Sequence, residues 1–103
     1  MKKKDLYSDM SWNISARLAE LRKESYQHLS SLPKYSDEAR SFGKWRYTLS
    51  VWQEQKEEGM VQIVVQAYYR GIFGWGTMMA DGFRIQKIGI IREVPQEERY
   101  QLT

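Results

Sequence analysis

The stretch Lys44–Tyr69, which reads KWRYTLSVWQEQKEEGMVQIVVQAYY, decides the fold. From residue 44 apolar and polar residues alternate, which is the period of a strand buried on one face. One side of this strand collects large apolar side chains: Trp45, Tyr47, Leu49 and Val51. Met60–Tyr69 is rich in β-branched and aromatic residues and predicts a second strand. The charged segment Gln53–Gly59 between them ends in glycine, as the loop of a hairpin does.

The alternation also predicts how the two strands pair. When the loop is centred on Lys56, apolar residues meet on a single face, as burial of that face requires. The predicted pairs are Val51 with Val61, Leu49 with Ile63, Tyr47 with Val65 and Trp45 with Ala67. The other residues point to the opposite side, which we call the outer face: Lys44, Arg46, Thr48, Ser50, Trp52, Met60, Gln62, Val64, Gln66, Tyr68 and Arg70.

Upstream of the hairpin, the sequence predicts one long helix from about Met10 to Leu32. Residues recurring every three or four positions form one mostly apolar stripe. The stripe comprises Met10, Ile14, Leu18, Leu21, Ser25, Leu29 and Leu32. Pro33 ends the helix, because the residue before a proline is driven out of the helical region. We expect residues 1–8 to form a flexible basic arm and residues 9–103 a single α+β domain, in which Lys34–Gly43 is a polar connector.

The region after Arg70 allows two interpretations. Asp81-Gly82 is typical of a two-residue hairpin turn, which would separate two strands there. Alternatively the strand runs on through Ile85, and a turn leads to a short last strand, Ile90–Val94. Both interpretations give four strands in all. Because the alternation is imperfect in both, we expect a β-bulge at one of the glycines.

The predicted architecture is α+β: a long N-terminal helix packed on a curled four-stranded antiparallel meander, with a short C-terminal helix that starts at Pro95–Glu98. This order of elements resembles that of cystatin-like folds, in which a curled sheet wraps a long helix. The segment Gln62–Gln66 is similar to the cystatin inhibitory motif, but a glutamine stands where that motif ends in glycine, and the segment lies within a strand. The resemblance is one of element order, and protease inhibition is not inferred from it.

Composition places the chain among globular proteins. Its 103 residues, of which 42% are hydrophobic and 28% charged, suffice for one core. No apolar run is long enough to span a membrane, and a chain without cysteine has no disulfide or thiolate chemistry. We expect a soluble, cytoplasmic protein.

The net charge of +3 is a property of the N-terminus. Lys2, Lys3 and Lys4 supply all of it, so the rest of the chain is neutral. Between Arg40 and Arg92, however, eight basic residues face four acidic ones, and the middle of the chain is mildly basic. Such an excess can guide an acidic partner, although it is weaker than the dense clusters typical of phosphate-backbone binding.

Residues with catalytic or metal-binding chemistry are few. The one histidine, His28, lies one turn after Glu24, and a partly solvated pair is a simpler interpretation than an acid–base pair or half of a metal site. No serine stands in a nucleophile-elbow pattern, and Asp81 beside Gly82 is typical of a turn. We therefore predict a non-catalytic protein with no cofactor and no metal site.

The outer face carries more apolar side chains than a solvated sheet face needs. We predict that it is an interface, through which the protein forms a homodimer or associates with another protein. The alternative is that the connector or the C-terminal segment of the same chain folds over this face. The residues expected at the interface are the apolar anchors Trp52, Met60, Val64 and Tyr68, with Arg46 and Arg70 setting the orientation.

A second hypothesis assigns the same face to single-stranded nucleic acid, with Trp52 and Tyr68 stacking on bases. Its phosphate contacts are Lys44, Arg46, Arg70 and the N-terminal lysines 2–4. A third hypothesis is a small-molecule pocket between helix and sheet. The residues expected to line that pocket are Trp45, Tyr47 and Trp75, with His28 at the mouth.

A minor stripe also recurs every seven residues on the predicted helix, formed by Trp12, Ala19 and Tyr26. We expect these side chains to pack against the rim of the sheet or the last helix, because a curled sheet embraces more than half of a helix. A contact between two copies of the chain is the alternative.

Overall fold

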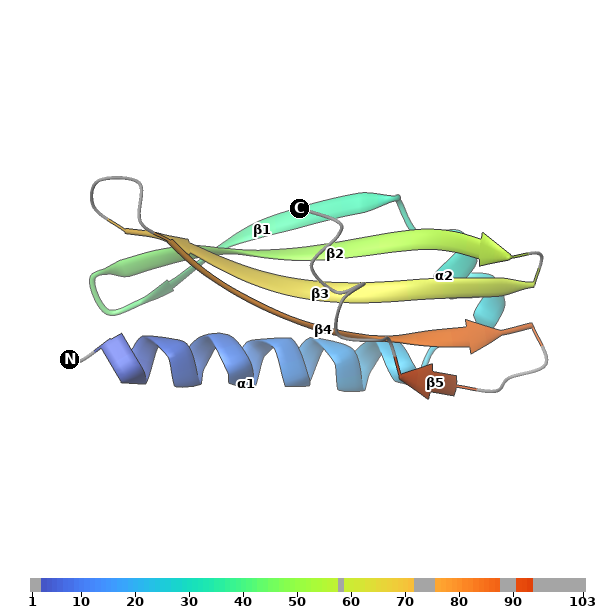
Figure 1. The fold of residues 1–103 in the computed structure, drawn as a ribbon, viewed down its shortest axis with the longest axis horizontal. Coiled ribbons are helices and arrows are strands. Elements are labelled where there is room, and N and C mark those ends of the chain that lie inside the picture. Colours follow the sequence, from blue (N-terminus) through green and yellow to red (C-terminus); the bar gives the residue numbers. More distant parts are fainter. Residues whose placement is uncertain (1–2, 58, 72–75, 88–90, 94–103) are drawn as a thin grey trace.

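The computed structural model describes residues 3–57, 59–71, 76–87 and 91–93, whose elements follow one another along the chain (Figure 1). Two helices come first, α1 (Lys3–Arg22) and α2 (Tyr26–Ser30). The strands are β1 (Tyr35–Phe42), β2 (Trp45–Glu57), β3 (Met60–Arg70), β4 (Gly76–Gln86) and β5 (Ile91–Glu93). Within these residues they form one antiparallel sheet in which each strand pairs with the next, in the order β1-β2-β3-β4-β5.

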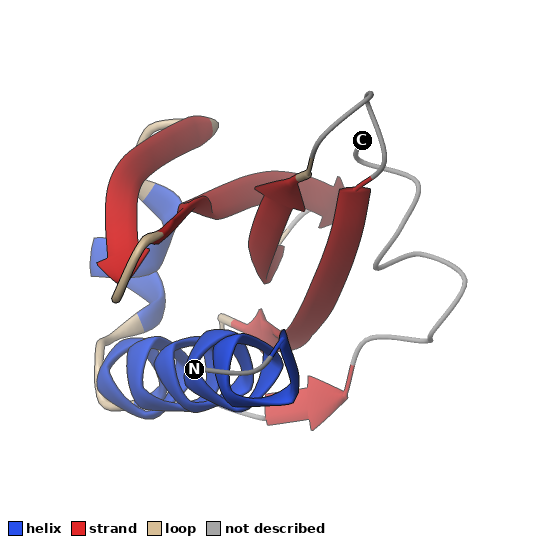
Figure 2. Cartoon of the chain, turned by 90° about the vertical axis from the view of Figure 1, so that its left-hand side faces the viewer, coloured by secondary structure: helices blue, strands red, loops and turns tan. Residues whose placement is uncertain are grey.

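The sheet curls over α1, which runs along its inner face (Figure 2). α1 contacts β2, β3 and β4, and buried apolar side chains fill the space between the two layers. They are Leu6, Met10, Ile14 and Leu18 from α1, and Tyr47, Leu49, Val51, Val61, Ile63, Val65, Ala67, Phe83 and Ile85 from the sheet. The predicted α+β class, with a helix packed on an antiparallel sheet, is confirmed. The helix predicted at Pro95–Glu98 lies outside the described residues.

α1 begins earlier than the sequence pattern indicated. Leu6 is completely buried, and Tyr7 packs against the core. Leu6 precedes Met10 by four residues and therefore extends the same buried stripe by one turn. The expectation of a flexible arm over residues 1–8 is wrong from Lys3 onward, because this turn has an apolar side chain to bury.

The single predicted helix is two helices. α1 ends at Arg22, and α2 starts after Ser25, whose side-chain oxygen accepts a hydrogen bond from His28 N at 3.1 Å. A serine in this position caps a new helix by satisfying one of its free N–H groups. The chain changes direction between the helices (Figure 2), while Leu29 of α2 stays buried. In the part of the chain that the structure describes, no helix is long and apolar enough to cross a membrane.

The segment expected to be a polar connector, Lys34–Gly43, forms strand β1 instead. β1 pairs with β2 without interruption from Tyr35 to Phe42, so the described sheet has one strand more than the four predicted. Gly43, with a φ of 60°, makes the two-residue turn between the strands together with Lys44. Most residues of β1 are exposed, and a strand without a buried face carries no apolar alternation in its sequence.

The β2–β3 hairpin has the predicted faces but a different register. Val51 lies opposite Val65 and Leu49 opposite Ala67, so β2 is shifted by four residues from the predicted pairing. Because the shift is an even number and side chains alternate with a period of two, each apolar residue stays on the inner face. β2 runs on to Glu57, through most of the segment expected to be a loop.

Contacts with α2 hold the extended part of β2. Gln53 is buried, and its side-chain amide donates to the carbonyl oxygen of Ser30 at 2.9 Å. Its backbone N–H donates to the carbonyl oxygen of Lys34 at 3.0 Å. A glutamine that is typical of a loop thus satisfies a carbonyl group at the end of a helix.

β4 follows the second of the two interpretations. It pairs with β3 along its whole length, so Asp81 and Gly82 lie within a strand. The expected bulge at a glycine is wrong for Gly82, and the register shift occurs in β2, between Gln55 and Glu57. A Cβ on Gly82 would collide with the carbonyl oxygen of Ile63, so this glycine permits the close approach of two strands.

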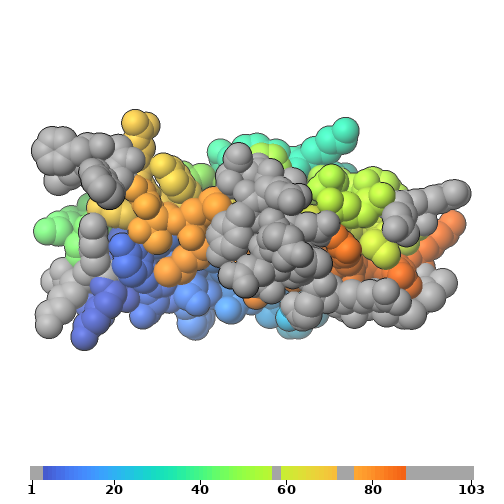
Figure 3. Space-filling model, viewed as in Figure 1, coloured from blue at the N-terminus to red at the C-terminus, as the bar shows by residue number. Residues whose placement is uncertain are grey.

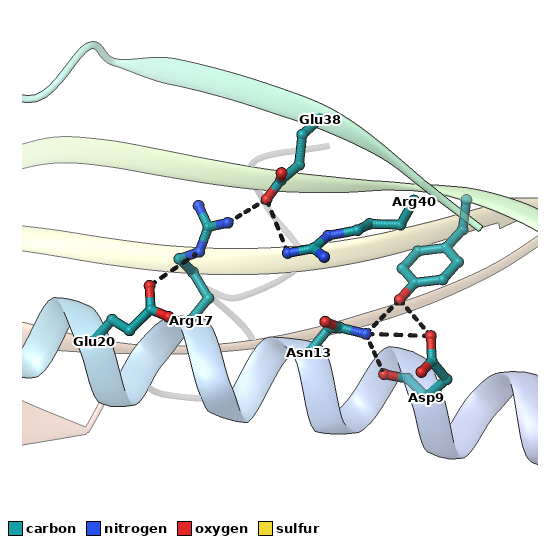
Figure 4. A network of polar contacts seen from close by, with 7 residues as sticks. Asp9, Asn13, Arg17, Glu20, Glu38 and Arg40 are labelled. Carbon is teal, nitrogen blue, oxygen red and sulfur yellow. Dashed lines mark hydrogen bonds and ion pairs between the residues drawn. The ribbon is translucent and has the colours of Figure 1, made fainter. Parts of the chain in front are cut away.

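Part of the layer between α1 and the sheet is polar (Figure 4). The Tyr47 hydroxyl donates to Asp9 Oδ2 at 2.8 Å and accepts a hydrogen bond from Asn13 Nδ2 at 2.7 Å. Burial, and after it the Asp9 carboxylate, raises the pKa of Tyr47 far above its usual value. These contacts tie the first half of α1 to β2.

The same polar seam continues toward β1 (Figure 4). Arg17 of α1 forms an ion pair with Glu38 of β1, and Arg40 Nη2 lies 3.4 Å from the same carboxylate oxygen. Arg17 Nε also lies 3.8 Å from Glu20 Oε2 on its own helix. Charged side chains therefore bridge the space between α1 and β1.

Candidate functional site

The side of the sheet away from α1 holds the residues proposed from sequence, and part of it is seen in Figure 3, where β4 (orange) lies above α1 (blue). These residues do not form one exposed apolar patch. Tyr68 is 43% exposed, Trp52 and Met60 are partly buried, and Val64 is completely buried. Trp52 lies opposite Val64, and its indole N–H donates to Gln66 Oε1 at 2.8 Å, so its ring lies beside Val64. Val64 therefore presents no surface to a partner.

A hollow of about 520 Å³ opens on this outer face, and we call it the aromatic groove. The described residues that line it are Tyr35, Asp37, Thr48, Ser50, Trp52, Gln66, Tyr68 and Met78. The rings of Tyr35 and Trp52 meet with their centroids 4.5 Å apart and their planes at 50°. The Tyr35 hydroxyl donates to Asp37 Oδ2 at 2.9 Å and lies 3.2 Å from Ser50 Oγ.

These contacts fix the aromatic rings of the groove. Trp52 is anchored by Gln66, and Tyr35 by Asp37 and Ser50. Tyr35 and Tyr68 keep nearly half of their surface exposed, so each ring is accessible from solvent. A preset flat apolar surface of this kind stacks on a flat ligand ring, and the surrounding hydroxyl and amide groups add hydrogen bonds.

A second hollow, of about 350 Å³, lies where β2 begins and β3 ends, and we call it the basic hollow. The described residues that line it are Lys44, Trp45, Arg46, Tyr69, Arg70 and Gly71. Lys44 Nζ lies 5.4 Å from the centroid of the Trp45 ring, within the range of a cation–π contact. No acidic residue is among these lining residues, and Lys44, Arg46 and Arg70 form no ion pair with a residue that the structure describes. No described acidic residue neutralises their positive charge.

The two hollows follow one another along the same strands. On β2, the outward residue after Arg46 is Thr48, which lines the aromatic groove. On β3, the outward residue before Arg70 is Tyr68, which lines the groove as well. The basic hollow therefore adjoins the end of the aromatic groove that holds Thr48 and Tyr68, whereas Trp52 lies farther along β2, opposite Val64. Met60 lies at the opposite end of β3 and is not part of this surface.

Sequence reasoning missed several residues of the site. Tyr35 and Asp37 fell in the expected connector, and Met78 fell in the region of undecided register. Trp45 and Tyr69 belong to the inner face but lie at strand ends, where their partly buried rings also line the basic hollow. One signal in the sequence could have revealed β1. Gly43-Lys44 is typical of a two-residue hairpin turn that begins with glycine, and such a turn has a strand on each side.

The small-molecule pocket expected between helix and sheet is not formed from the proposed residues. Tyr47 is buried against the first half of α1, whereas His28 is exposed in α2, beyond the other end of α1. Trp75 lies outside the described residues. His28 Nε2 is 3.9 Å from Glu24 Oε2 in a solvated pair, and no cluster of three or more metal-ligating residues occurs in the described ranges.

The minor stripe on the predicted helix does not pack as expected. Trp12 is 69% exposed and Ala19 is exposed as well, because the sheet does not reach this side of α1. Tyr26 belongs to α2 and packs against the core. The prediction that Trp12 and Ala19 pack against the rest of the chain is therefore wrong.

Comparison of the chain with protein-family models, with curated proteins and with solved structures gives no match. A function for this protein therefore rests on the geometry of the two hollows.

Proposed function

We propose that this protein binds single-stranded nucleic acid along the outer face of its sheet. The observation that carries the proposal is the basic hollow, in which Lys44, Arg46 and Arg70 surround one depression without an acidic residue among the described lining. Unpaired cations at close quarters attract a polyanion and release its counterions when they replace them. A surface cation held in an ion pair would gain less from a phosphate.

The aromatic groove supplies the second half of the binding surface. Tyr68 and Tyr35 are nearly half exposed, and Trp52 stands between them on β2. Aromatic rings beside a basic track are the usual means by which proteins hold single strands, because every base offers a face for stacking. We infer that phosphates lie over the basic hollow and that the following bases stack in the groove.

A single strand fits this surface better than a duplex. Bases in a duplex are already stacked on one another, so the exposed rings of Tyr35 and Tyr68 would have no face to contact. Among the residues that the structure describes, the outer face also presents no helix or protruding ribbon that would enter a major groove. Recognition by stacking and phosphate contacts tolerates many sequences, and we expect little preference among bases.

Homodimerisation through the outer face, which sequence analysis ranked first, stays a prediction with less support. Of its four apolar anchors, Tyr68 alone is more than one-third exposed, and Val64 is fully buried. Polar groups surround the exposed rings, so the hydrophobic centre that a stable interface needs is small. The proposal involves binding without a chemical step, in keeping with the predicted non-catalytic role.

The test is the affinity for a fluorescently labelled single-stranded oligonucleotide, measured by anisotropy over a range of salt concentrations. We expect the affinity to fall with rising salt, with a logarithmic slope of about 0.7 for each phosphate contacted. Replacing both Arg46 and Arg70 with alanine should weaken binding about tenfold or more and flatten the slope. Replacing Tyr68 with alanine should weaken binding about tenfold and leave the slope unchanged, since a stacking contact is worth about 1–3 kcal/mol.

Lys87→Ala is the matched control, because Lys87 is an exposed cation at the end of β4 away from the basic hollow. It should leave both affinity and slope unchanged. No binding at low salt, or an equal loss in Lys87→Ala and in the arginine variant, would overturn the proposal. A duplex of the same sequence should bind more weakly than the single strand.

A further inference from the structure

β1 is the edge strand of the sheet, and its side away from β2 pairs with no other strand of the described chain (Figure 1). It is eight residues long and pairs with β2 without a bulge. A straight edge of this length offers a row of free backbone N–H and C=O groups, which another strand can bind. Pro33 precedes the strand, so no proline interrupts the edge itself.

The hydrogen bonds to β2 determine which backbone groups of β1 are free. Gln53 N donates to Lys34 O at 3.0 Å, so these two residues form a hydrogen-bonded pair of the ladder. Hydrogen-bonded and non-hydrogen-bonded pairs alternate along antiparallel strands. The even-numbered residues of β1 therefore direct their N–H and C=O groups to β2. The odd-numbered residues direct theirs to the free edge: Tyr35, Asp37, Ala39 and Ser41.

This edge is complementary to a second copy of itself in one register. Antiparallel pairing of two β1 strands must match odd residues with odd residues, because only these have free backbone groups. Placing Ala39 opposite Ala39 of the partner subunit brings Glu38 opposite the partner's Arg40, on the inner face. The smallest shift that keeps odd residues opposite odd residues moves the partner strand by two residues. In one direction this shift places Glu38 opposite the partner's Glu38, and in the other it places Arg40 opposite the partner's Arg40. Opposite charges directly across two strands stabilise a pair, and like charges destabilise it.

We propose that the protein forms a dimer through antiparallel pairing of β1 with β1 of a second copy, with Ala39 on the two-fold axis. Three residue pairs then each exchange two backbone hydrogen bonds: the Ala39–Ala39 pair on the axis and the two Asp37–Ser41 pairs beside it. The two sheets become one continuous sheet with both α1 helices on the same side. Charged residues on an edge strand usually prevent such pairing. In this register, however, Glu38 of each copy lies opposite Arg40 of the other copy.

The charged groups facing this position support the register. Arg17 contacts Glu38 from α1, and Arg40 Nη2 lies 3.4 Å from the same oxygen. Arg40 Nε is buried and has no hydrogen-bond partner. A partner does not reach this buried atom, but the Arg40 side chain as a whole is 39% exposed, and the partner's Glu38 across the edge supplies an acceptor for its exposed part. An interface formed mainly by one pair of eight-residue strands is small for a protein dimer. We therefore expect weak association, with dissociation in the micromolar range.

The first test is the solution mass by sedimentation across a dilution series that spans this range. Glu38→Arg alone places arginine opposite arginine, and Arg40→Glu alone places glutamate opposite glutamate. Each variant should therefore have a dissociation constant raised about tenfold or more. An equal mixture of the two variants restores opposite charges at both positions and should dimerise as strongly as the wild-type protein. Failure of the mixture to dimerise, with both variants folded by circular dichroism, would overturn the proposal.

The second test reads the edge itself and needs no variant. Amide hydrogen exchange should become slower with rising protein concentration at Asp37, Ala39 and Ser41. Amides of the even-numbered residues should be protected at every concentration, because they already pair with β2. A dimer that leaves the odd-numbered amides unprotected, or a monomer throughout the micromolar range, contradicts the edge pairing. Neither outcome bears on oligonucleotide binding, which the outer face performs in either state.

Discussion

The two faces of the sheet are built from alternate residues of the same strands, yet they differ in what they can do. On the inner face of β3, Val61, Ile63 and Val65 are completely buried against α1. On the outer face, Gln62, Val64 and Gln66 are also buried, although no described helix covers them. Trp52 bonded to Gln66 and Arg84 bonded to Gln62 lie across this part of the strand. Apolar residues on both faces of β3 thus mark a central strand, and the accessible part of its outer face lies toward its Arg70 end.

The largest effect on stability should come from the inner face. Phe83 is completely buried in the core, and Phe83→Ala should lower the free energy of unfolding by about 3–5 kcal/mol. The loss combines the transfer energy of the ring with the cavity left behind. Urea denaturation followed by tryptophan fluorescence measures it. Phe83→Leu, which keeps most of the volume, should cost clearly less, and an equal loss in both variants would mean that the core does not close around this ring.

A smaller effect should come from the centre of the outer face. Gly82→Ala places a methyl group against the carbonyl oxygen of Ile63 and the backbone of Val64. We expect a loss of about 1–3 kcal/mol, because the strands must separate to make room. Ala80→Ser adds one atom on the same face of the same strand, where exposure is greater, and should change the stability little. Equal stability of Gly82→Ala and the wild-type protein would contradict the close approach of β3 and β4.

The polar seam between α1 and the sheet should contribute less again, and its contribution should depend on pH. Tyr47→Phe removes the hydrogen bonds to Asp9 and Asn13 and should cost about 1–2 kcal/mol near neutral pH. Because burial raises the pKa of Tyr47 in the folded state, the unfolded chain loses this proton first, at a pH of about 10. The stabilisation is therefore complete below that pH and is lost as the pH rises toward the folded-state pKa.

Denaturant unfolding of the wild-type protein and Tyr47→Phe at a series of alkaline pH values measures this difference. The other tyrosines are common to both proteins, so the difference in the free energy of unfolding isolates Tyr47. The wild-type protein should lose its advantage above a pH of about 10. A difference that stays constant through this range would contradict the raised pKa.

The smallest effect on stability should come from the accessible part of the outer face. Tyr68 is 43% exposed, and Tyr68→Ala should change the free energy of unfolding by about 0.5 kcal/mol or less. The same variant is expected to weaken oligonucleotide binding, so stability and binding separate at this residue. Thermal unfolding of Tyr68→Ala beside the anisotropy titration tests the separation. A large loss of stability would assign Tyr68 to the fold and remove it from the site.

The candidate site could be predicted in part. Lys44, Arg46 and Arg70 were assigned to one surface from the alternation of the strands, and the structure places them in one hollow. Tyr35 and Asp37 could not be assigned, because β1 is an exposed edge strand whose residues follow no apolar period. The exposure of Val64 was mispredicted, since alternation tells which face a side chain takes and not what lies beside it.

By itself the sequence determined which side chains share a face, because the periods of two and of about four belong to the local backbone geometry of strands and helices. It also determined the α+β class and the position of β3. The register of β2, the break between α1 and α2, and the strand at residues 35–42 were decided by the tertiary structure. Each depends on contacts between distant segments: Gln53 with the end of α2, Leu29 with the core, and β1 with β2. An even shift of register leaves every face unchanged, so the pattern of the sequence is compatible with several pairings and only packing selects one.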